Sequence, residues 1–285
     1  MLMKFSISLF LTAACLVTAV SLSAETTNVP DEIKVMSYNI RLGSANDGTN
    51  SWNLRYMATK EMIEDKMPDV FGVQEALDYQ VLFIDEMCED YECVGVGRDD
   101  GKKKGEYMSI FWNKKTIKKV KWGTFWLSET PDKPSKGWDA ECMRTATWAI
   151  LKHKKSGKQF LFVNTHLDHV GEQAQRKGLA LIAEKIRELN PKGLPVVLTG
   201  DFNVKPDNPA LDALDGLLKC TRETAPRTDR SNTYNAWGKA KPDMIIDYIY
   251  MSGFSSCPEY QTVTDRYQDR KFISDHYPVM SRLIF

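Results

Sequence analysis

The stretch LTGDFNVKP, residues 198–206, joins an apolar segment to a group of polar residues. The residues LPVVL before it have the apolar, β-branched composition of a buried strand. Asp201 and Asn203 follow at its end, two positions apart. Alternate side chains of a strand point the same way, so both can face one ligand. Asp201 alone could equally cap the next turn. The other motifs of the chain are needed to distinguish a capping role from a ligand-binding one.

Several other segments have strand composition, and most of them also end in polar residues. They are residues 33–40, 68–76, 106–112, 145–151, 159–167, 244–251 and 278–285. The segment KHKKSGK between the fourth and fifth of these has the composition of a hairpin turn. Helical spacing of apolar residues appears in residues 53–67, 171–190 and 208–219. This mixture predicts an α/β or α+β sandwich of mixed sheets with helices outside.

The N-terminus has the pattern of an export signal. Lys4 is followed by an apolar stretch and then by small residues that end near Ala24. We therefore expect residues 1–24 to be a signal peptide, residues 25–285 to form one domain, and the protein to be periplasmic or secreted. No later segment has the ~20 apolar residues that span a bilayer.

Composition adds weaker constraints. The chain has 38 basic and 38 acidic residues, so it lacks the basic excess typical of nucleic-acid binding by electrostatics. The lysine-rich run NKKTIKKVK, residues 113–121, is typical of a solvated turn or an edge strand. Cys88 and Cys93 are close enough in sequence for export to permit a disulfide between them.

The polar residues at the strand ends have a common chemistry. They are Asn39, Glu75, His166, Asp168, Asp201, Asn203, Asp247, Asp275 and His276. Carboxylate and amide oxygens suit a hard cation such as Mg²⁺. The chain has no G-x-S-x-G nucleophile, no Walker glycine loop and no H-E-x-x-H. Water activated beside a metal is then the expected nucleophile, with histidine as a base or a charge stabiliser.

The order of these segments resembles the endonuclease/exonuclease/phosphatase superfamily. SYNIR, GVQEA, GEYMSIFW, NTHLDH, LTGDFNVKP, IDYIY and SDHYPV are similar to its successive motifs, and the resemblance extends over nearly all of residues 33–285. The resemblance implies a four-layer sandwich of two packed mixed β-sheets flanked by helices. The segment from GTFWLSET to MRTATW resembles an exported bacterial branch.

The resemblance also implies a role for each motif residue. Glu75 is similar to the main Mg²⁺ (or Mn²⁺) ligand, and Asn39 and Asp275 to residues of the same metal site. The catalytic set implied by the resemblance is Asp201, which orients or deprotonates water, Asn203, which donates to phosphate, His276 with its partner Asp247, and His166.

Two substrate-binding residues are also implied. Tyr107 falls in the family's substrate-side strand, and Arg144 stands where relatives place a phosphate-binding arginine. One position departs from the apurinic-endonuclease-like members: they have a carboxylate two positions after the first asparagine, and this chain has Arg41. Asp47, within an Asp-Gly turn signal, could compensate.

We therefore expect a metal-dependent hydrolase of phosphate esters, with a phosphodiester as the first choice. A phosphomonoesterase acting on sugar or inositol phosphates is the alternative, and so is an inactive relative that only binds phosphate ligands. Nucleic acid, a lipid head group and a sugar phosphate all remain open as substrates. We expect a monomer.

Overall fold

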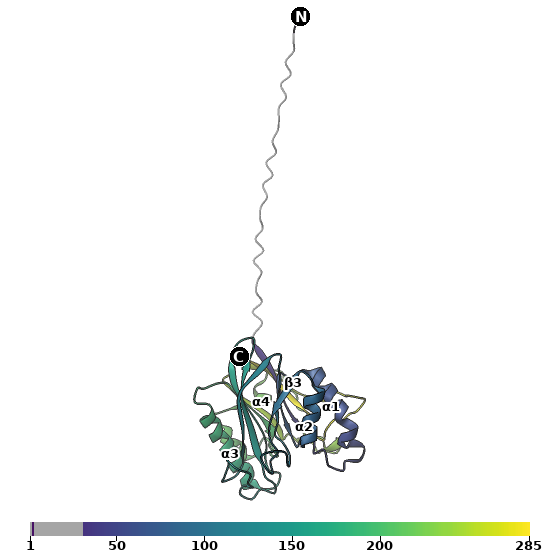
Figure 1. The fold of residues 1–285 in the computed structure, drawn as a ribbon, viewed down its shortest axis with the longest axis vertical. Helices are drawn as coiled ribbons and strands as arrows, with labels where there is room; N and C mark the ends of the chain where they lie inside the picture. Colours follow the sequence, from purple (N-terminus) through teal and green to yellow (C-terminus); the bar gives the residue numbers. More distant parts are fainter. Residues whose placement is uncertain (1, 3–30) are drawn as a thin grey trace.

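The computed structural model describes residue 2 and residues 31–285, and within them two six-stranded sheets pack face to face. Helices cover both outer faces, with α3 on one side and α1 and α2 on the other (Figure 1). This four-layer α/β sandwich confirms the predicted fold class. The expected signal peptide, apart from Leu2, lies outside the described residues.

The first sheet has the strand order β11-β12-β1-β2-β4-β3. Its members are β1 (Glu32–Asn39), β2 (Val70–Gln74), β3 (Tyr91–Val94), β4 (Ile110–Asn113), β11 (Ser256–Thr262) and β12 (Val279–Ile284). α1 (Trp52–Lys66) and α2 (Asp78–Met87) pack on its outer face through a core that includes Met62 and Ile84. β1 and β2 run parallel, so their carboxyl ends lie together.

The second sheet has the order β5-β6-β7-β8-β10-β9. Its members are β5 (Ile117–Trp126), β6 (Thr145–His153), β7 (Gln159–His166), β8 (Val196–Asp201), β9 (Lys219–Cys220) and β10 (Asp247–Ser252). The outer face is covered by α3 (Glu172–Leu189). Short turns of helix complete the described chain: η1 (Gly48–Asn50), η2 (Pro209–Leu214), α4 (Thr221–Thr224) and η3 (Ala236–Gly238).

α3 illustrates how the sequence pattern becomes packing. Leu179, Ile182 and Ile186 recur at helical spacing and are almost completely buried against the second sheet. Burial of each such side chain contributes about 1.5–3 kcal/mol. The helix begins where the Asp139 carboxylate accepts the N–H of Ala174 at 2.7 Å, and it ends before Pro191. The predicted helix over residues 171–190 is thus confirmed within one residue at each end.

Other segments show where sequence patterns were informative and where they failed. The lysine-rich run forms a turn and then the first half of β5, which is an edge strand, as expected. The segment 106–112 was predicted as a strand, but β4 begins only at Ile110. Residues 97–107 instead fold back on themselves, with Gly97 paired to Tyr107. α2 was not predicted, because ten residues are too few to separate helical from strand periodicity reliably.

A polar network crosses the interior between the two sheets. Gln74 on β2 donates to the Asn164 side chain on β7 at 2.7 Å, and Asn164 donates to the Val73 carbonyl at 2.8 Å. The Thr199 hydroxyl on β8 donates to the same Asn164 oxygen at 3.1 Å. The sheets approach so closely here that a Cβ on Gly72 would lie 2.3 Å from the Asn164 side chain. Glycine is therefore required at position 72 by close approach.

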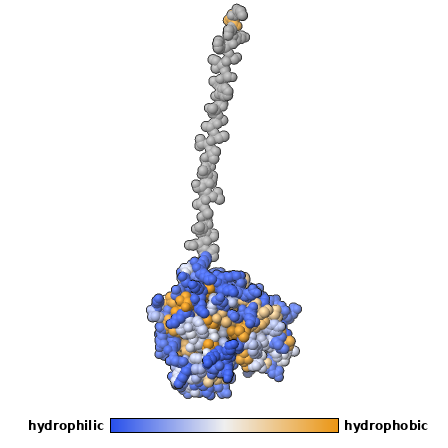
Figure 2. Space-filling view, viewed as in Figure 1, coloured by the Kyte–Doolittle hydropathy of each residue, from blue (hydrophilic) through white to orange (hydrophobic). Residues whose placement is uncertain are grey.

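The surface of the described residues is mainly hydrophilic on the face seen in Figure 2, with smaller hydrophobic groups among the hydrophilic ones. None of the helices in these residues has the length and apolar character needed to cross a membrane. Cys88 and Cys93 are both free thiols, so the disulfide that export would permit is not formed.

Candidate active site

Three neighbouring strands of the second sheet carry titratable side chains in one row. His166, the last residue of β7, is in register with Asp201, the last residue of β8. Asp201 is in turn paired with Asp247, the first residue of the antiparallel strand β10. Strand direction explains this arrangement, since the carboxyl ends of two parallel strands meet the amino end of an antiparallel one. The three residues are far apart in sequence and adjacent in space.

The first sheet contributes its own strand ends to the same place. Asn39 ends β1, Glu75 follows β2, and Asp275 and His276 lie in the loop before β12. Together these residues surround a cavity of about 530 Å³. The cavity is lined by Arg41, Leu42, Glu75, Arg98, Glu106, Cys142, Arg144, His166, His169, Asp201, Asn203, Tyr234, Met244, Ile246, Asp275 and His276.

Asn39 holds two carboxylates in position from behind this lining. Its Nδ2 donates to Glu75 Oε1 and to Asp201 Oδ2, both at 2.9 Å. Its Oδ1 accepts the backbone N–H of Arg41 at 3.0 Å, which fixes the orientation of the amide. Because Asn39 is completely buried, these bonds fix the separation of the two carboxylates across the two sheets.

His276 has an acidic environment. Its Nδ1 lies 2.8 Å from Asp247 Oδ2, and its Nε2 lies 3.6 Å from Asp201 Oδ2. Burial lowers the pKa of His276, but the charges of Asp247 and Asp201 outweigh burial and raise the pKa well above its usual value. Burial and the charge of Asp247 raise the pKa of Asp201. His276 is therefore the cation, and Asp201 is a carboxylate with increased affinity for a proton.

His166 has the opposite environment. Asn203 Nδ2 lies 2.9 Å from its Nε2, and its Nδ1 is buried with no hydrogen-bond partner in the described part of the chain. Burial, followed by the positive charges of Arg144 and Arg98, lowers the pKa of His166 well below its usual value. His166 is therefore neutral and accepts the hydrogen bond from Asn203 through Nε2.

The backbone around the site adopts unusual conformations. Arg41 and Glu75 both have φ of 63°, and Asn203 has φ of 52°. Non-glycine residues rarely adopt this left-handed region, and each instance costs on the order of 1–3 kcal/mol. The surrounding bonds stabilise it: the Glu75 carboxylate accepts the Leu42 N–H at 2.8 Å, and Asp201 accepts the Asn203 N–H at 2.9 Å.

Arg41 occupies the position at which the apurinic-endonuclease-like members have a carboxylate. It forms two hydrogen bonds of 3.0 Å with Asp47, and its Nη1 lies 3.5 Å from Asp275. The Asp47 carboxylate is therefore paired with arginine. The departure from the apurinic-endonuclease pattern introduces a cation beside Asp275.

The two predicted substrate-binding residues are placed differently. Arg144 lines the cavity, and its Nη1 is buried with no hydrogen-bond partner among residues 31–285. Its Nε lies 3.3 Å from Asp168 and its Nη2 3.0 Å from His169. Tyr107 is not among the lining residues, because its hydroxyl donates to Asp78 at 2.7 Å. Its role in binding substrate stays a prediction, which this hydrogen bond does not favour.

Asp168 supports the loop beside Arg144. Its Oδ1 accepts the N–H groups of Val170 and Gly171 at 3.0 and 2.9 Å. Burial would raise the pKa of Asp168, but backbone N–H groups, including those of Glu141 and Cys142, hold it well below its usual range. Asp168 thus orients Arg144 and stays ionised.

Among the lining residues that sequence reasoning missed, four have charged, imidazole or phenol side chains: Arg98, Glu106, His169 and Tyr234. No sequence signal marked Glu106, because alternation along an extended segment places it on the side opposite to Tyr107, which was expected to face the substrate. Tyr234 packs on His276, with ring centroids 4.9 Å apart. It comes from an irregular loop with no periodic pattern, so no sequence signal marked it.

The donor set fits a hard divalent cation. Side-chain atoms of Glu75, His166 and Asp201 lie within 4.8 Å of one another, whereas in the neighbouring group of Asp201, Asp247 and His276 the protonated imidazole itself supplies the positive charge. Asp247 Oδ1 is buried with no partner in the described residues. Several carboxylates at this spacing repel one another unless a cation lies among them. Oxygen-rich ligands of this kind are those that Mg²⁺ and Mn²⁺ take.

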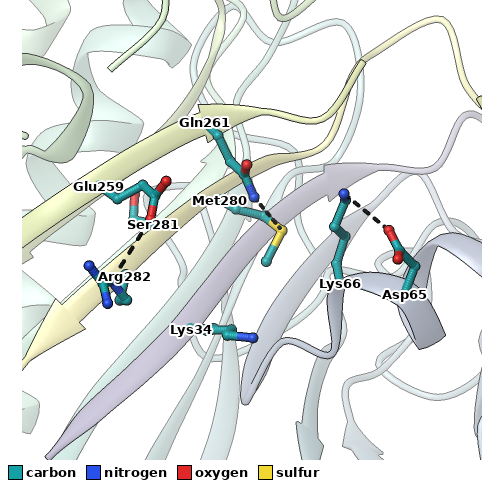
Figure 3. A pocket seen from close by; sticks show the side chains of 8 residues that line it. All are labelled: Lys34, Asp65, Lys66, Glu259, Gln261, Met280, Ser281 and Arg282. Carbon is teal, nitrogen blue, oxygen red and sulfur yellow. Dashed lines mark hydrogen bonds and ion pairs between the residues drawn. The ribbon is translucent and has the colours of Figure 1, made fainter. Parts of the chain in front are cut away.

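A second hollow, of about 270 Å³, lies on the outer face of the first sheet near the end of α1 (Figure 3). Most of its charged side chains form ion pairs with neighbours: Lys66 lies 3.0 Å from Asp65 and 2.7 Å from Asp265. Arg282 lies 3.3 Å from Glu32. These ion pairs indicate a salt-bridged surface and no chemistry like that of the cavity at the strand ends.

Comparison with known proteins agrees with this geometry. A protein of the endonuclease/exonuclease/phosphatase family from Bacteroides thetaiotaomicron is 37% identical, with a TM-score of 0.85, over 90% of this chain and 98% of that one. The mannosyl-6-phosphatase of the same organism is 38% identical, with a TM-score of 0.85, over 89% of this chain and 100% of that one. An uncharacterized mimivirus protein is 25% identical over 87% of this chain and 98% of its own length.

The family model matches most of the described chain, residues 36–276. This range contains all the strand-end residues discussed above, from Asn39 to His276. Phosphoesterases occur among the relatives, which supports a hydrolase acting on phosphate esters. The chain therefore belongs to the endonuclease/exonuclease/phosphatase family.

Proposed function

We propose that the protein is a divalent-metal-dependent phosphoesterase whose substrate is the phosphate monoester of a sugar. The observation that carries the proposal is the convergence of Asp201, His276 and Glu75 on one cavity, with Asn39 bonded to both carboxylates. Mg²⁺ or Mn²⁺ held by Glu75 and Asp275, beside Asn39, would neutralise phosphate charge and make water more acidic.

Asp201 is the best base for the attacking water. Its raised proton affinity favours uptake of a proton from water as the new bond to phosphorus forms. The ester P–O bond breaks at the same phosphorus, and the leaving sugar oxygen takes a proton from solvent water, so that the sugar departs as an alcohol. His276 is already protonated, so it stabilises the negative charge of the transition state instead of acting as the base. Asp247 orients it through Nδ1.

Arg144 and Asn203 bind the phosphate from the other side. The unpartnered Nη1 of Arg144 is a charged donor at the cavity wall. A guanidinium matches the planar spacing of two phosphate oxygens. Asn203 donates to His166 at 2.9 Å and can turn that donor toward a phosphate oxygen.

The choice of a sugar monoester has two supports. One is the mannosyl-6-phosphatase, which is 38% identical to this chain and is covered along its whole length. The other is the cavity, whose volume of about 530 Å³ suits a small molecule. A phosphodiester, the first choice from the sequence, is the rival substrate.

One assay separates these substrates. The purified protein is given mannose 6-phosphate, p-nitrophenyl phosphate or bis(p-nitrophenyl) phosphate, with Mg²⁺ or Mn²⁺ and then with EDTA. We expect metal-dependent release of phosphate from the two monoesters, with Asp201→Ala as the blank. Release from the diester alone would overturn the monoester proposal. Release from no substrate, with intact metal binding by calorimetry, would support an inactive relative.

We also propose export, on the pattern of residues 1–24. Fractionation of cells that express the full chain tests this proposal. Protein confined to the cytoplasm and still carrying its N-terminus would contradict it.

A further inference from the structure

A loop that contains none of the predicted catalytic residues brings a charged pair to the cavity wall. Residues 97–107 fold back on themselves, and the Arg98 N–H donates to the Glu106 carbonyl at 3.0 Å. The side chains meet as well, with Arg98 Nη1 2.6 Å from Glu106 Oε2. Each side chain is only 12% exposed, and both line the cavity.

The pair lies directly beside the phosphate site. Tyr107, next to Glu106, donates its N–H to the Ala76 carbonyl at 2.7 Å, and Ala76 follows Glu75. Burial and the neighbouring Glu75 raise the pKa of Glu106, while Arg98 opposes this shift. On the other side, the charges of Arg144 and Arg98 both reach His166. A substrate whose phosphorus lies at Asp201 would extend its remaining part toward this wall.

The pair is not needed to close its own loop. Backbone bonds already do so, from Gly97 N to Lys102 O at 3.0 Å and from Asp99 N to Lys104 O at 3.0 Å. Trp126 Nε1 further anchors the Arg98 carbonyl at 2.7 Å. Largely buried ion pairs contribute little net stability, because desolvation offsets their attraction. A ligand-binding role therefore explains the position of this pair better than a structural one.

The chemistry of the pair selects its ligand. Arg98 bonds Glu106 through Nη1, which leaves further N–H donors of its guanidinium at the cavity wall. Glu106 is an acceptor beside it. A second phosphate would be repelled by the Glu106 charge, whereas a neutral hydroxyl can accept from the guanidinium and donate to the carboxylate. Two neighbouring hydroxyl groups of a sugar present this combination.

We propose that Arg98 and Glu106 form a subsite that binds sugar hydroxyl groups and sets the preference for the alcohol part of the substrate. This inference rests on the proposed function and adds the residues that recognise the sugar. Arg144 and the cation held by the carboxylates would bind the phosphate in the same arrangement, so the two ends of the substrate are recognised by different residues.

The test compares a substrate with hydroxyl groups and one without. Glu106→Gln and Arg98→Lys are assayed on mannose 6-phosphate and on p-nitrophenyl phosphate, each with the full chain and saturating Mg²⁺. Glu92→Gln is the matched control, since Glu92 is exposed on β3 and does not line the cavity. We expect kcat/KM for the sugar phosphate to fall about 10- to 100-fold in the pair variants, the size of losing a hydrogen bond to a charged group. The value for p-nitrophenyl phosphate should change less than about threefold.

Sugar phosphates that lack one hydroxyl each then identify the group that is bound. The wild type should discriminate against one of them, and Glu106→Gln should lose that discrimination. Equal losses on both substrates in folded variants would mean a structural role and would overturn the subsite, while the phosphoesterase proposal would stand. Failure of the wild type on every monoester would instead overturn the proposed function, and the subsite with it.

Discussion

The surroundings of His166 and His276 show how one cavity can contain two different electrostatic environments. Both imidazoles lie near the same carboxylate, with Asp201 Oδ2 3.4 Å from His166 Nε2 and 3.6 Å from His276 Nε2. The remaining neighbours differ. The negative charge of Asp247 raises the pKa of His276. The positive charges of Arg144 and Arg98 lower the pKa of His166. Burial is the same for both, so the neighbouring charges decide the protonation of each ring.

The difference divides the cavity into two sides. Carboxylates that can bind a cation lie on the His276 side, and arginines that can bind an anion lie on the His166 side. A phosphate ester between them would meet opposite charges on its two faces. The following variants break or sharpen this division, from the largest expected effect to the smallest.

Removal of the shared carboxylate should have the largest effect. Asp201→Asn eliminates the proposed base and leaves the shape nearly unchanged, so kcat should fall by about 10³-fold or more. Steady-state phosphate release measures the loss, and circular dichroism checks the fold. A folded Asp201→Asn variant with normal turnover would remove Asp201 from the mechanism.

Replacement of His276 should come next and should change the pH profile. His276→Gln removes the cation, and we expect kcat to fall about 10²-fold. Because the folded pKa of His276 is raised, the wild type keeps this charge through neutral pH and loses it on the alkaline side. The alkaline fall in kcat should therefore be missing from His276→Gln. An unchanged alkaline limb would assign that titration to another group.

Asp168→Asn should lower stability more than activity. The amide turns a donor toward groups that already donate to Asp168, such as the Cys142 N–H at 3.2 Å, so the free energy of unfolding should fall by about 2 kcal/mol at pH 7. The folded pKa of Asp168 is depressed, so its contribution is present above pH ~4 and is lost as the pH falls further. Urea unfolding at pH 7 and pH 3.5 should show the difference between variant and wild type shrinking in acid. A constant difference would contradict this linkage.

Arg144→Lys should have the smallest effect. Lysine keeps the charge and loses the planar fork, so KM should rise about tenfold with little change in kcat. The pKa of His166 should stay low, because a positive charge remains beside it; the ring signals in an NMR titration report this. Arg144→Met should remove the positive charge that disfavours protonation of His166 and so raise the pKa of His166. Equal His166 titrations in the two variants would mean that burial alone sets its pKa.

Much of this arrangement was predictable from the chain. The apolar strands that end on Asn39, Asp201 and His166 indicated both the sandwich and the position of its site. Local pattern does not reveal long-range contacts. The Tyr107 hydroxyl is bonded to Asp78 on α2, a helix that periodicity did not reveal, and the role of Tyr107 in binding substrate stays a prediction. Glu106 faces the cavity.

The contacts of Arg41 could not be predicted from the sequence either. The sequence showed that it replaces a carboxylate, but its bonds to Asp47 depend on a left-handed turn that no periodicity encodes. The charges that separate His166 from His276 also come from residues distant in sequence. Their distances could be obtained only from the folded chain.

The Gln74–Asn164–Thr199 network between the sheets has a consequence for how the site tolerates motion and change. Each member lies within two positions of a site residue: Gln74 precedes Glu75, Asn164 precedes His166, and Thr199 precedes Asp201. The network therefore fixes the position of one sheet relative to the other beneath the cavity. The close approach of the sheets at Gly72 restricts any shift between them. Sliding of one sheet past the other would break buried hydrogen bonds before it moved a catalytic group. Adaptation to new substrates should thus proceed through the loops above the site, with the sheet alignment unchanged.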